Sequence, residues 1–414
     1  MVPKIKHLRR WAEYARWDLI AHSCWLKANR LNTNVSVLRL WAAAALLLAW
    51  ILPHQSTAQT VDTSAEFAYL IDLSSDTVLM EKKADVPTAP ASMSKMMTVL
   101  MVFERLKSGT LSMDDTFPVS EKAWRKGGSK MFVEVGSRVS VEDLLRGIIV
   151  QSGNDACIVV AEGLAGSEAA FAAEMTARAQ EIGLEDSYFT NSTGWPEDGH
   201  EMSARDLARV AGFLIEEYPD YYRMFAEKTF EYHDIRQSNR NPLLYDGTGA
   251  DGLKTGHTEE AGYGLTASAK RGDRRLILVL NGMDSAETRA REAERLLEWG
   301  FRYFEAYPLF KTGQVVEHAP VWLGDRETVP MVLDQDLTVT LSRSARSGME
   351  VSIRYEAPIA SPVRKGNRIG TLVVTAPDTD PVERPLVAQS DVEALGPAGR
   401  VLRLARHWIG RWIP

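Results

Sequence analysis

Two hydrophobic periodicities follow one another along this chain and divide it into regions. Over residues 62–305, segments that alternate with the two-residue period of strands are interspersed with segments that have the period of amphipathic helices. From Gln314 to Val374 the helical period disappears, and short alternating segments are separated by Gly, Pro and Asp. The pattern predicts a mixed α/β domain over residues 62–305 and a small all-β sandwich domain over residues 306–392.

Two β-hairpins are expected in the first domain. Phe67–Asp72 and Thr77–Glu81 form one candidate pair, and Gly262–Lys270 and Arg274–Gly282 form the other. The connections are short and rich in Ser, Gly and Asp, which favours antiparallel pairing. The predicted fold class is therefore α/β (α+β), with helices around an antiparallel sheet.

Helices are expected wherever apolar residues recur at helical spacing. Ser140 with Asp143 three residues later is a capping pattern, and that helix should end near Ile148 to Gln151. Ser152-Gly153-Asn154 then interrupts the apolar pattern. The other expected helices are the run after Ser92, Asp155–Leu164, residues 168–183, residues 203–216 and Glu287–Phe304.

The N-terminal part, residues 1–58, has the pattern of a secretory signal. Residues 1–37 are basic, and the thirteen-residue apolar run Leu40–Leu52 is followed by Ser56-Thr57-Ala58. A basic, an apolar and a small-residue segment in this order predict a signal peptide cleaved after Ala58. An uncleaved anchor is the alternative, although the run is short for a span. The long basic region leaves the start site open. We expect export to the periplasm.

The C-terminal part, residues 393–414, is predicted to contain an amphipathic helix. Apolar residues recur at helical spacing from Val401 to Trp412, and arginines fall mostly on the other side. A basic face opposite an apolar face favours a helix that lies in the membrane interface, on the outer face of the inner membrane for an exported chain. The alternative is a terminal helix that packs on the protein. The charges exclude a membrane span.

Composition narrows the class of protein. The formal net charge of −7 and the pI near 5.7 give no reason to expect nucleic-acid binding. Cys24 precedes the expected cleavage site, so the mature chain would keep Cys157 alone, without an internal disulfide. We expect Cys157 to be buried and inert. The eight histidines are scattered without a metal-binding spacing, so no metal or cofactor is indicated.

Ser92 and Lys95 are the first candidates for chemistry. Pro87 and Pro90 precede them and an apolar helical run follows, so both side chains fall on one face of a helix start. A serine hydroxyl needs a base to become a nucleophile, and Lys95 is the base at that spacing. Such a lysine needs a pKa near ~7–8, about three units below its ordinary value. A capping serine followed by a surface lysine is the alternative interpretation.

Two further motifs extend this candidate site. Ser152-Gly153-Asn154 offers a hydroxyl for proton relay and an amide, although a helix C-cap is the alternative. Lys254-Thr255-Gly256, followed by His257, comes just before the second hairpin, where Gly256 allows a ligand to approach the backbone. Lys311-Thr312-Gly313 repeats the same letters without a hairpin and is interpreted as a turn.

Ser-x-x-Lys, Ser-x-Asn and Lys-Thr-Gly in this order resemble the signature of the penicillin-recognising serine enzymes. The chain is similar more closely to the low-molecular-weight D-alanyl-D-alanine carboxypeptidases. The similar segments are Val150–Ala156, Ser203–Asp206, Asn239–Asn241 and Asp251–Thr258. The resemblance runs from about Phe67 to the C-terminus, because these enzymes also have a β-rich second domain and an amphipathic anchor. The long N-terminal extension departs from the pattern.

This resemblance implies a role for each motif. Ser92 would attack the carbonyl between the two D-alanines of a peptidoglycan stem peptide, with Lys95 as its base. Ser152 and Lys254 would pass a proton to the leaving D-alanine.

The resemblance also implies the groups that bind substrate. Asn154 would hold the substrate amide, and Arg240 with Thr255 would bind the terminal carboxylate. The backbone N–H groups of Ser92 and His257 would form the oxyanion hole, and Gly256 would let the substrate approach the backbone. A strand-end histidine and a loop arginine are the alternative interpretations of His257 and Arg240.

The expected function is a serine-type D-Ala-D-Ala carboxypeptidase that is inhibited by β-lactams. A DD-endopeptidase or a β-lactamase on the same fold is one alternative, although no candidate deacylation carboxylate is evident. A non-catalytic penicillin-binding scaffold is another. The expected partners are stem peptides, β-lactams and the membrane surface, with an envelope protein as a candidate partner of the β domain.

Overall fold

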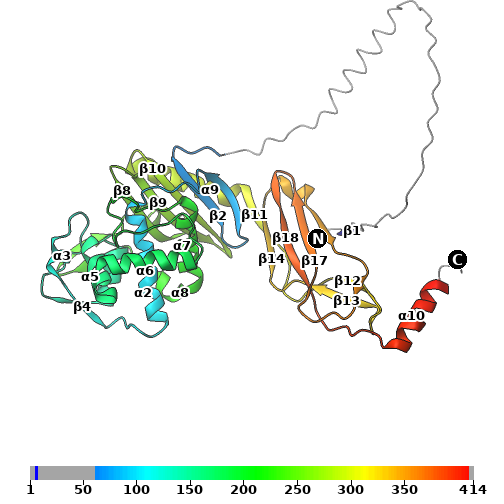
Figure 1. Cartoon of the computed structure of the whole chain (residues 1–414). Coiled ribbons are helices and arrows are strands. Elements are labelled where there is room, and N and C mark those ends of the chain that lie inside the picture. The colour runs from blue at the N-terminus through cyan, green and yellow to red at the C-terminus, as the bar shows by residue number, and fades with distance from the viewer. Residues whose placement is uncertain (1–4, 8–60, 410–414) are drawn as a thin grey trace, which may run out of the picture. The chain divides into compact units, whose positions relative to one another are not determined.

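The computed structural model describes residues 5–7 and 61–409, which form two compact units (Figure 1). The first unit comprises Val61–Lys311 and Gln335–Arg346, and the second comprises the remaining described residues. The expected boundary near residue 306 assigns Gln335–Arg346 to the second domain instead. This segment belongs to the first unit because its strand β14 (Leu337–Ser342) pairs with β11 (Phe304–Phe310), which directly follows the last helix of that unit.

The first unit is built on a five-stranded antiparallel sheet in the order β3-β2-β10-β9-β8. Both predicted hairpins are present, and they meet where β10 pairs with β2. Strand β8 lies at one edge of the sheet. The strands are β2 (Phe67–Asp72), β3 (Thr77–Lys82), β8 (Ala250–Thr258), β9 (Gly262–Arg271) and β10 (Arg274–Met283).

Helices cover both faces of this sheet (Figure 1). The predicted helices are all present, with ends within a few residues of those expected. The α-helices are α2 (Lys95–Lys107), α3 (Glu121–Arg125), α4 (Val141–Ile149), α5 (Asn154–Ala165), α6 (Glu168–Glu181), α7 (Ala204–Glu217), α8 (Pro219–Tyr222) and α9 (Ala286–Tyr303). Short 3-10 helices are η1 (Ala91–Ser94), η2 (Arg223–Ala226), η3 (Pro242–Leu244) and, at the end of the segment that contains β14, η4 (Ala345–Gly348).

Serine side chains cap the N-termini of several of these helices. Ser140 accepts a hydrogen bond from the backbone N–H of Asp143, which confirms the predicted capping pattern. Ser203 caps α7 in the same way through Asp206 N–H. Each such cap stabilises its helix by about 1 kcal/mol, because it satisfies a donor that has no partner inside the helix.

The sheet separates two hydrophobic cores. Alternate residues of β10 point to opposite faces, as the two-residue period of a strand requires. Ile277 and Val279 pack in the core that contains α2, α4, α5 and α7. Leu276, Leu278 and Leu280 pack in the second core with Leu296 and Leu297 of α9. The helical core also encloses Cys157, which is fully buried as predicted.

Two small ribbons complete the first unit. Strand β4 (Thr116–Pro118) pairs with β5 (Arg138–Ser140), and β6 (Thr229–Tyr232) pairs with β7 (Ile235–Ser238). Both ribbons are too short to show a clear alternation of polar and apolar residues. The sequence therefore did not predict them.

The second unit is all-β, as predicted, and is followed by a helix. Its strands join in one continuous sheet in the order β1-β15-β17-β18-β13-β12-β16. Helix α10 (Pro397–Ile409) lies in the region where an amphipathic helix was expected. The strands are β1 (Ile5–His7), β12 (Val315–Trp322), β13 (Thr328–Val332), β15 (Glu350–Arg354), β16 (Ile359–Ala360), β17 (Arg368–Ala376) and β18 (Thr379–Ala388).

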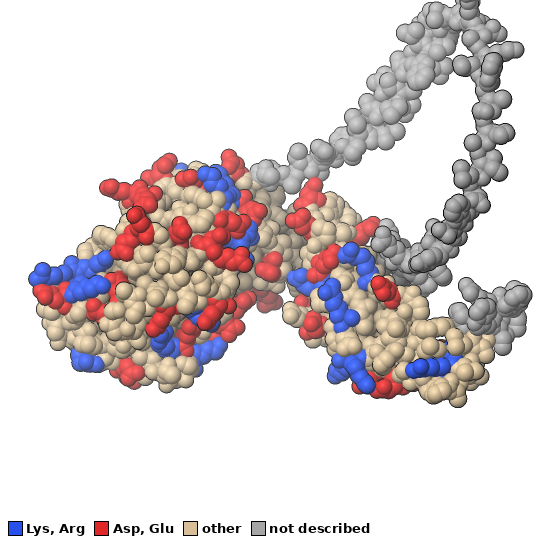
Figure 2. Space-filling view, viewed as in Figure 1, with Lys and Arg blue, Asp and Glu red and all other residues tan. Residues whose placement is uncertain are grey.

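Within residues 5–7 and 61–409, no single helix is long and apolar enough to cross a bilayer, and α5 with α6 meets that test only as a pair bent by 82°. The same residues contain no group of three or more His, Cys, Asp or Glu side chains placed to hold a metal ion. Apart from residues 5–7, the predicted signal sequence (residues 1–58) lies outside the described residues. Acidic and basic side chains are interspersed on the visible face of each unit (Figure 2).

Candidate active site

Ser92 and Lys95 lie at the junction of η1 and α2. Pro90 precedes η1, and Lys95 is the first residue of α2, so the two side chains are one turn apart on the same face. The Lys95 Nζ lies 2.8 Å from Ser92 Oγ. The Nζ also donates a hydrogen bond to the backbone carbonyl of Thr193. A hydroxyl and an amine are therefore held in direct contact.

The Lys95 side chain is fully buried, and this changes its chemistry. Burial disfavours the ammonium form and is the main reason why the pKa of Lys95 falls to about 8. The positive charges of Arg240 and Lys126 lower this pKa further. At pH 7, a pKa of about 8 leaves about one such amine in ten neutral, against about one in 10³ for an ordinary lysine. Lys95 can therefore act as a base near neutral pH.

Ser152-Gly153-Asn154 forms the sharp turn between α4 and α5. Ser152 is buried and has a φ of +58°, in the left-handed region that few residues other than glycine adopt. The Asn154 side-chain amide donates to the carbonyl of Gly127, 2.9 Å away. The Asn154 N–H donates to Ser129 O at 2.7 Å. Contacts to a separate loop therefore hold the turn in place.

That loop, Gly127–Lys130, borders the candidate site through its contacts with Asn154 and Arg240. Gly128 has a φ of +77°, and a Cβ there would lie 2.7 Å from the Asn154 amide nitrogen. The next residue, Ser129, accepts a hydrogen bond of 2.6 Å from the Arg240 guanidinium. The loop therefore connects Asn154 to Arg240, and it comes so close to Asn154 that only glycine fits.

Lys254 lies on the edge strand β8, and its side chain is 3% exposed. Its Nζ donates to the carbonyl of Thr255 at 3.0 Å. Burial lowers the pKa of Lys254 well below its ordinary value, and the charges of Lys95 and Arg240 lower it further. The two buried lysines and Arg240 therefore form one electropositive group.

The edge of β8 packs against the helix that contains Ser92. A Cβ at Gly256 would lie 2.9 Å from Pro90 O and 3.1 Å from the Ala91 Cβ. Because no side chain fits in that space, Gly256 allows β8 to lie directly beside η1. The Lys-Thr-Gly segment and the Ser92 segment are therefore brought together, although about 160 residues separate them in the sequence.

His257 and Arg240 lie at the exposed margins of this group. The His257 ring stacks on Tyr263 of β9, with ring centroids 3.9 Å apart. Arg240 follows β7, and its neighbour Asn241 donates to the carbonyl of Gly252 on β8 at 2.8 Å. His257 is therefore held by a contact to β9, and the segment that contains Arg240 is held by a contact to β8.

The sequence analysis missed one part of the site, the loop that contains Thr193. Its carbonyl accepts a hydrogen bond from Lys95. Asn191 Oδ1 accepts hydrogen bonds from the backbone N–H groups of Thr193 and Gly194 at 3.0 and 2.9 Å. Every residue has a backbone carbonyl, so the sequence does not indicate which one contacts Lys95. The only signal was an asparagine followed three residues later by a glycine, which is typical of a side-chain-capped turn.

An open cavity of about 500 Å³ lies beside these segments. It is lined by Pro87–Ala89, Pro196–Glu201 and Glu260. Pro87–Ala89 precede Ser92, and Pro196–Glu201 follow the Thr193 loop. Glu260 follows the end of β8. None of the candidate site residues lines this cavity, so the cavity is distinct from the space around Ser92.

Comparison with known proteins identifies the class of fold. A family model described as D-alanyl-D-alanine carboxypeptidase matches residues 54–285, and one described as penicillin-binding protein 5, C-terminal domain, matches residues 304–394. The chain is similar to D-alanyl-D-alanine carboxypeptidase DacA of Escherichia coli (strain K12), with 36% identity over 84% of this chain and 89% of the relative.

Two solved structures show the same fold. Penicillin binding protein 5 from Haemophilus influenzae is 34% identical, with a TM-score of 0.77, over 81% of this chain and 99% of that one. Penicillin-binding protein D2 from Listeria monocytogenes in its ampicillin-bound form is 29% identical, with a TM-score of 0.54, over 59% of this chain and 100% of that one. The chain belongs to the D-alanyl-D-alanine carboxypeptidase family. It is a serine-type carboxypeptidase of the low-molecular-weight penicillin-binding group, as the sequence predicted.

Proposed function

We propose that the chain removes the terminal D-alanine from peptidoglycan stem peptides through an acyl-enzyme on Ser92. The main support is the 2.8 Å contact between Lys95 Nζ and Ser92 Oγ, in a site where burial lowers the pKa of Lys95 to about 8. This arrangement supplies both a nucleophile and its base.

The proposed reaction has two steps. The neutral Lys95 amine accepts the Ser92 proton while Ser92 Oγ bonds to the carbonyl carbon between the two D-alanines. The C–N bond then breaks while Ser152, with Lys254, relays the proton held by Lys95 to the leaving amine of D-alanine, which leaves Lys95 neutral again. Water subsequently attacks the ester, which releases the shortened peptide and restores the Ser92 hydroxyl.

The electropositive group would bind the anionic end of the substrate. We assign the terminal carboxylate to Arg240 and Thr255, because a guanidinium can hold two carboxylate oxygens. Asn154 would bind the substrate amide. The Ser92 and His257 N–H groups would stabilise the oxyanion, where one donor is typically worth ~3–4 kcal/mol. Gly256 does not open β8 to a ligand as expected, because Pro90 and Ala91 occupy the space beside it.

A β-lactam would acylate the same serine. The support is the similarity to the Listeria protein in its ampicillin-bound form. The strained amide of the antibiotic would take the place of the peptide carbonyl, and its carboxylate would meet the same positive charges. Inhibition by β-lactams would therefore accompany peptidase activity.

We further propose that the protein is exported and attached to the outer face of the inner membrane. The sequence of residues 1–58 supports export. On α10, Val401 and Leu402 are 68% and 59% exposed, which leaves apolar surface on a helix that also bears Arg400 and Arg403. An envelope protein partner of the second unit stays a prediction.

The family match favours the carboxypeptidase over a DD-endopeptidase, a β-lactamase or a non-catalytic scaffold. Fluorescent penicillin labelling of the wild type and of Ser92→Ala, followed by measurement of D-alanine release from a pentapeptide, separates these functions. We expect labelling and release with the wild type and neither with Ser92→Ala. Labelling without release would exclude a carboxypeptidase.

A further inference from the structure

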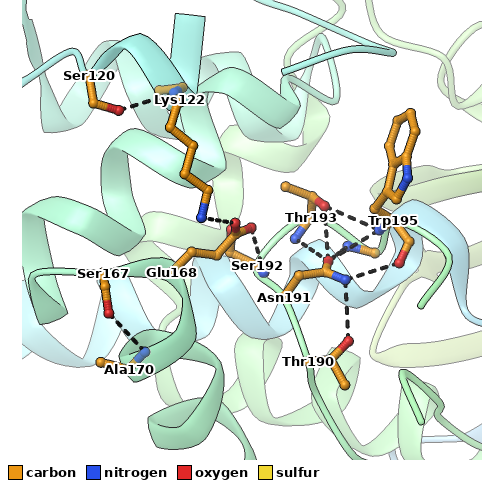
Figure 3. A network of polar contacts seen from close by, with 12 residues as sticks. Ser120, Lys122, Ser167, Glu168, Ala170, Thr190, Asn191, Ser192, Thr193 and Trp195 are labelled. Carbon is orange, nitrogen blue, oxygen red and sulfur yellow. Dashed lines mark hydrogen bonds and ion pairs between the residues drawn. The ribbon is translucent and has the colours of Figure 1, made fainter. Parts of the chain in front are cut away.

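Glu168 is a buried carboxylate close to the candidate site, and the proposed reaction does not use it. It is the first residue of α6 and is 6% exposed. Its Oε1 accepts hydrogen bonds from Ser192 Oγ at 2.9 Å and from Ser192 N at 3.3 Å. Its Oε2 lies 2.7 Å from Lys122 Nζ (Figure 3). The carboxylate therefore connects α6, α3 and the loop that begins at Asn191.

Glu168 is connected to Lys95 through two neighbouring residues, Ser192 and Thr193. Ser192 directly precedes Thr193, whose carbonyl accepts the hydrogen bond from Lys95 Nζ. The carbonyl of Ser192 in turn accepts from Thr98 Oγ1 at 2.7 Å, on the same helix as Lys95. Ser192 is thus held from both sides, and its position determines where the Thr193 carbonyl points.

The negative charge of the Glu168 carboxylate is balanced by the Lys122 ammonium group. The ion pair with Lys122 and the hydrogen bonds from Ser192 lower the pKa of Glu168, although burial by itself raises it. The carboxylate is therefore ionised at neutral pH. Burial of the Glu168 carboxylate without the Lys122 ammonium beside it would cost free energy. The position of Ser192 therefore depends on both Glu168 and Lys122.

We propose that Glu168, paired with Lys122, is a positioning residue that holds the Thr193 carbonyl against Lys95 and keeps water away from the amine. This inference rests on the proposed role of Lys95 as the base for Ser92. Burial is the largest cause of the lowered pKa of Lys95. Release of the loop would admit water to Nζ and raise that pKa.

The test is the second-order rate of acylation by a fluorescent penicillin, measured from about pH 6 to about pH 10. For Glu168→Leu, which removes both Ser192 hydrogen bonds and the charge, we expect a rate about 10- to 100-fold lower at neutral pH, the usual effect of a small misplacement. We also expect the acid limb of the profile to move to higher pH.

Two further variants make this test specific. Glu168→Gln keeps an oxygen that can accept from Ser192 and should recover part of the rate, which also covers the case in which Glu168→Leu does not fold. Glu181→Leu removes an exposed carboxylate at the other end of α6, which pairs with Arg178 at 2.8 Å, and should leave the profile unchanged.

The inference is overturned if folded Glu168→Leu has the wild-type rate and the wild-type acid limb. It is also overturned if the rate falls while the acid limb stays in place, because that would show a structural role without an effect on Lys95. If the wild type itself is not acylated at Ser92, the proposed function fails instead, so the two failures can be told apart.

Discussion

Lys95 shows how a buried position changes the chemistry of one side chain. Its amine is enclosed by the helical core, touches Ser92 Oγ, and lies within the field of Arg240 and Lys126. Burial disfavours the ammonium form most strongly, and the positive charges of Arg240 and Lys126 disfavour it further. A pKa lowered to about 8 corresponds to roughly 3 kcal/mol between the two protonation states.

This lowered pKa predicts the pH dependence of acylation. The reactive form of Lys95 is the neutral one, so the rate of acylation by a β-lactam should rise with pH and level off above about 8. Below that value it should fall about tenfold per pH unit. Stopped-flow measurement of acylation across this range provides the check. A rate that still rises steeply at pH 10 would mean that the amine has the pKa of an ordinary lysine.

Lys254→Arg tests the second buried lysine. The change keeps the positive charge, but guanidinium is larger and does not lose its proton, so it cannot pass one to the leaving group. We expect kcat for D-alanine release to fall about 100-fold. Steady-state kinetics with a pentapeptide, beside the conservative change Lys270→Arg on the exposed end of β9, would show it. Near-normal kcat would place Lys254 outside the reaction.

At the residue scale, the sequence predicted groups that have a recognisable chemical motif and missed those that do not. Ser92, Lys95, Ser152 and Lys254 could be chosen because their residue types and spacing suggest acid–base chemistry. The Thr193 carbonyl and the Glu168 carboxylate could not be chosen, because a backbone group and one acidic residue among many have no distinctive pattern. Their importance depends on contacts between distant segments.

At the scale of elements, the Gly127–Lys130 loop and strand β8 both depend on glycine for their position in the site. Gly256 lets β8 approach η1, and Gly128 lets the loop approach Asn154. In both places the side chains of two separate elements would otherwise compete for the same volume. The site is therefore assembled by close approach of backbones as well as by its polar side chains.

Gly128→Ala should disturb the site more than it disturbs the fold. The new Cβ would lie 2.7 Å from the Asn154 amide nitrogen, at a φ of +77°. The left-handed conformation alone costs about 1–2 kcal/mol. We expect acylation to slow at least about tenfold because Asn154 is displaced.

Gly109→Ala is the matched control. Gly109 has a φ of +73°, and a Cβ there would meet no atom within 4 Å. It should lower stability by a similar amount and leave the acylation rate unchanged. Equal rates for the two variants would show that the contact between Gly128 and Asn154 has no part in the reaction.

Prediction of elements succeeded where periodicity was long and capping was explicit. The hairpins and the helix capped by Ser140 had clear patterns, and the Lys311-Thr312-Gly313 segment is a turn, as interpreted. The ribbons β4–β5 and β6–β7 were missed because strands of three or four residues have too few positions to show a period. Strand β14 falls in the region predicted to be all-β, but its pairing with β11 was not predicted, because pairing between distant segments is set by tertiary contacts.

At the scale of the whole molecule, the chain combines a catalytic unit, a β-rich unit and a terminal helix. The change of hydrophobic period near residue 306 was sufficient to predict a second region of different class. It could not show that Gln335–Arg346 returns to the first unit, since that depends on the pairing of β14.

Deletion of Gly399–Pro414 tests the proposed membrane attachment. Four arginines in this segment could contribute ~4 kcal/mol near anionic lipid, in addition to the apolar side chains. We expect the truncated mature protein to appear in the soluble fraction after cell fractionation, with its acylation rate unchanged. A truncated protein that sediments with membranes would show that attachment lies elsewhere in the chain.

The most direct test of the central claim is mass spectrometry of the protein after brief exposure to benzylpenicillin, followed by peptide mapping. The account predicts one covalent adduct with the mass of the intact antibiotic, on the peptide that contains Ser92. It predicts no adduct on Ser92→Ala. An adduct on another residue, or one that persists in Ser92→Ala, would contradict it.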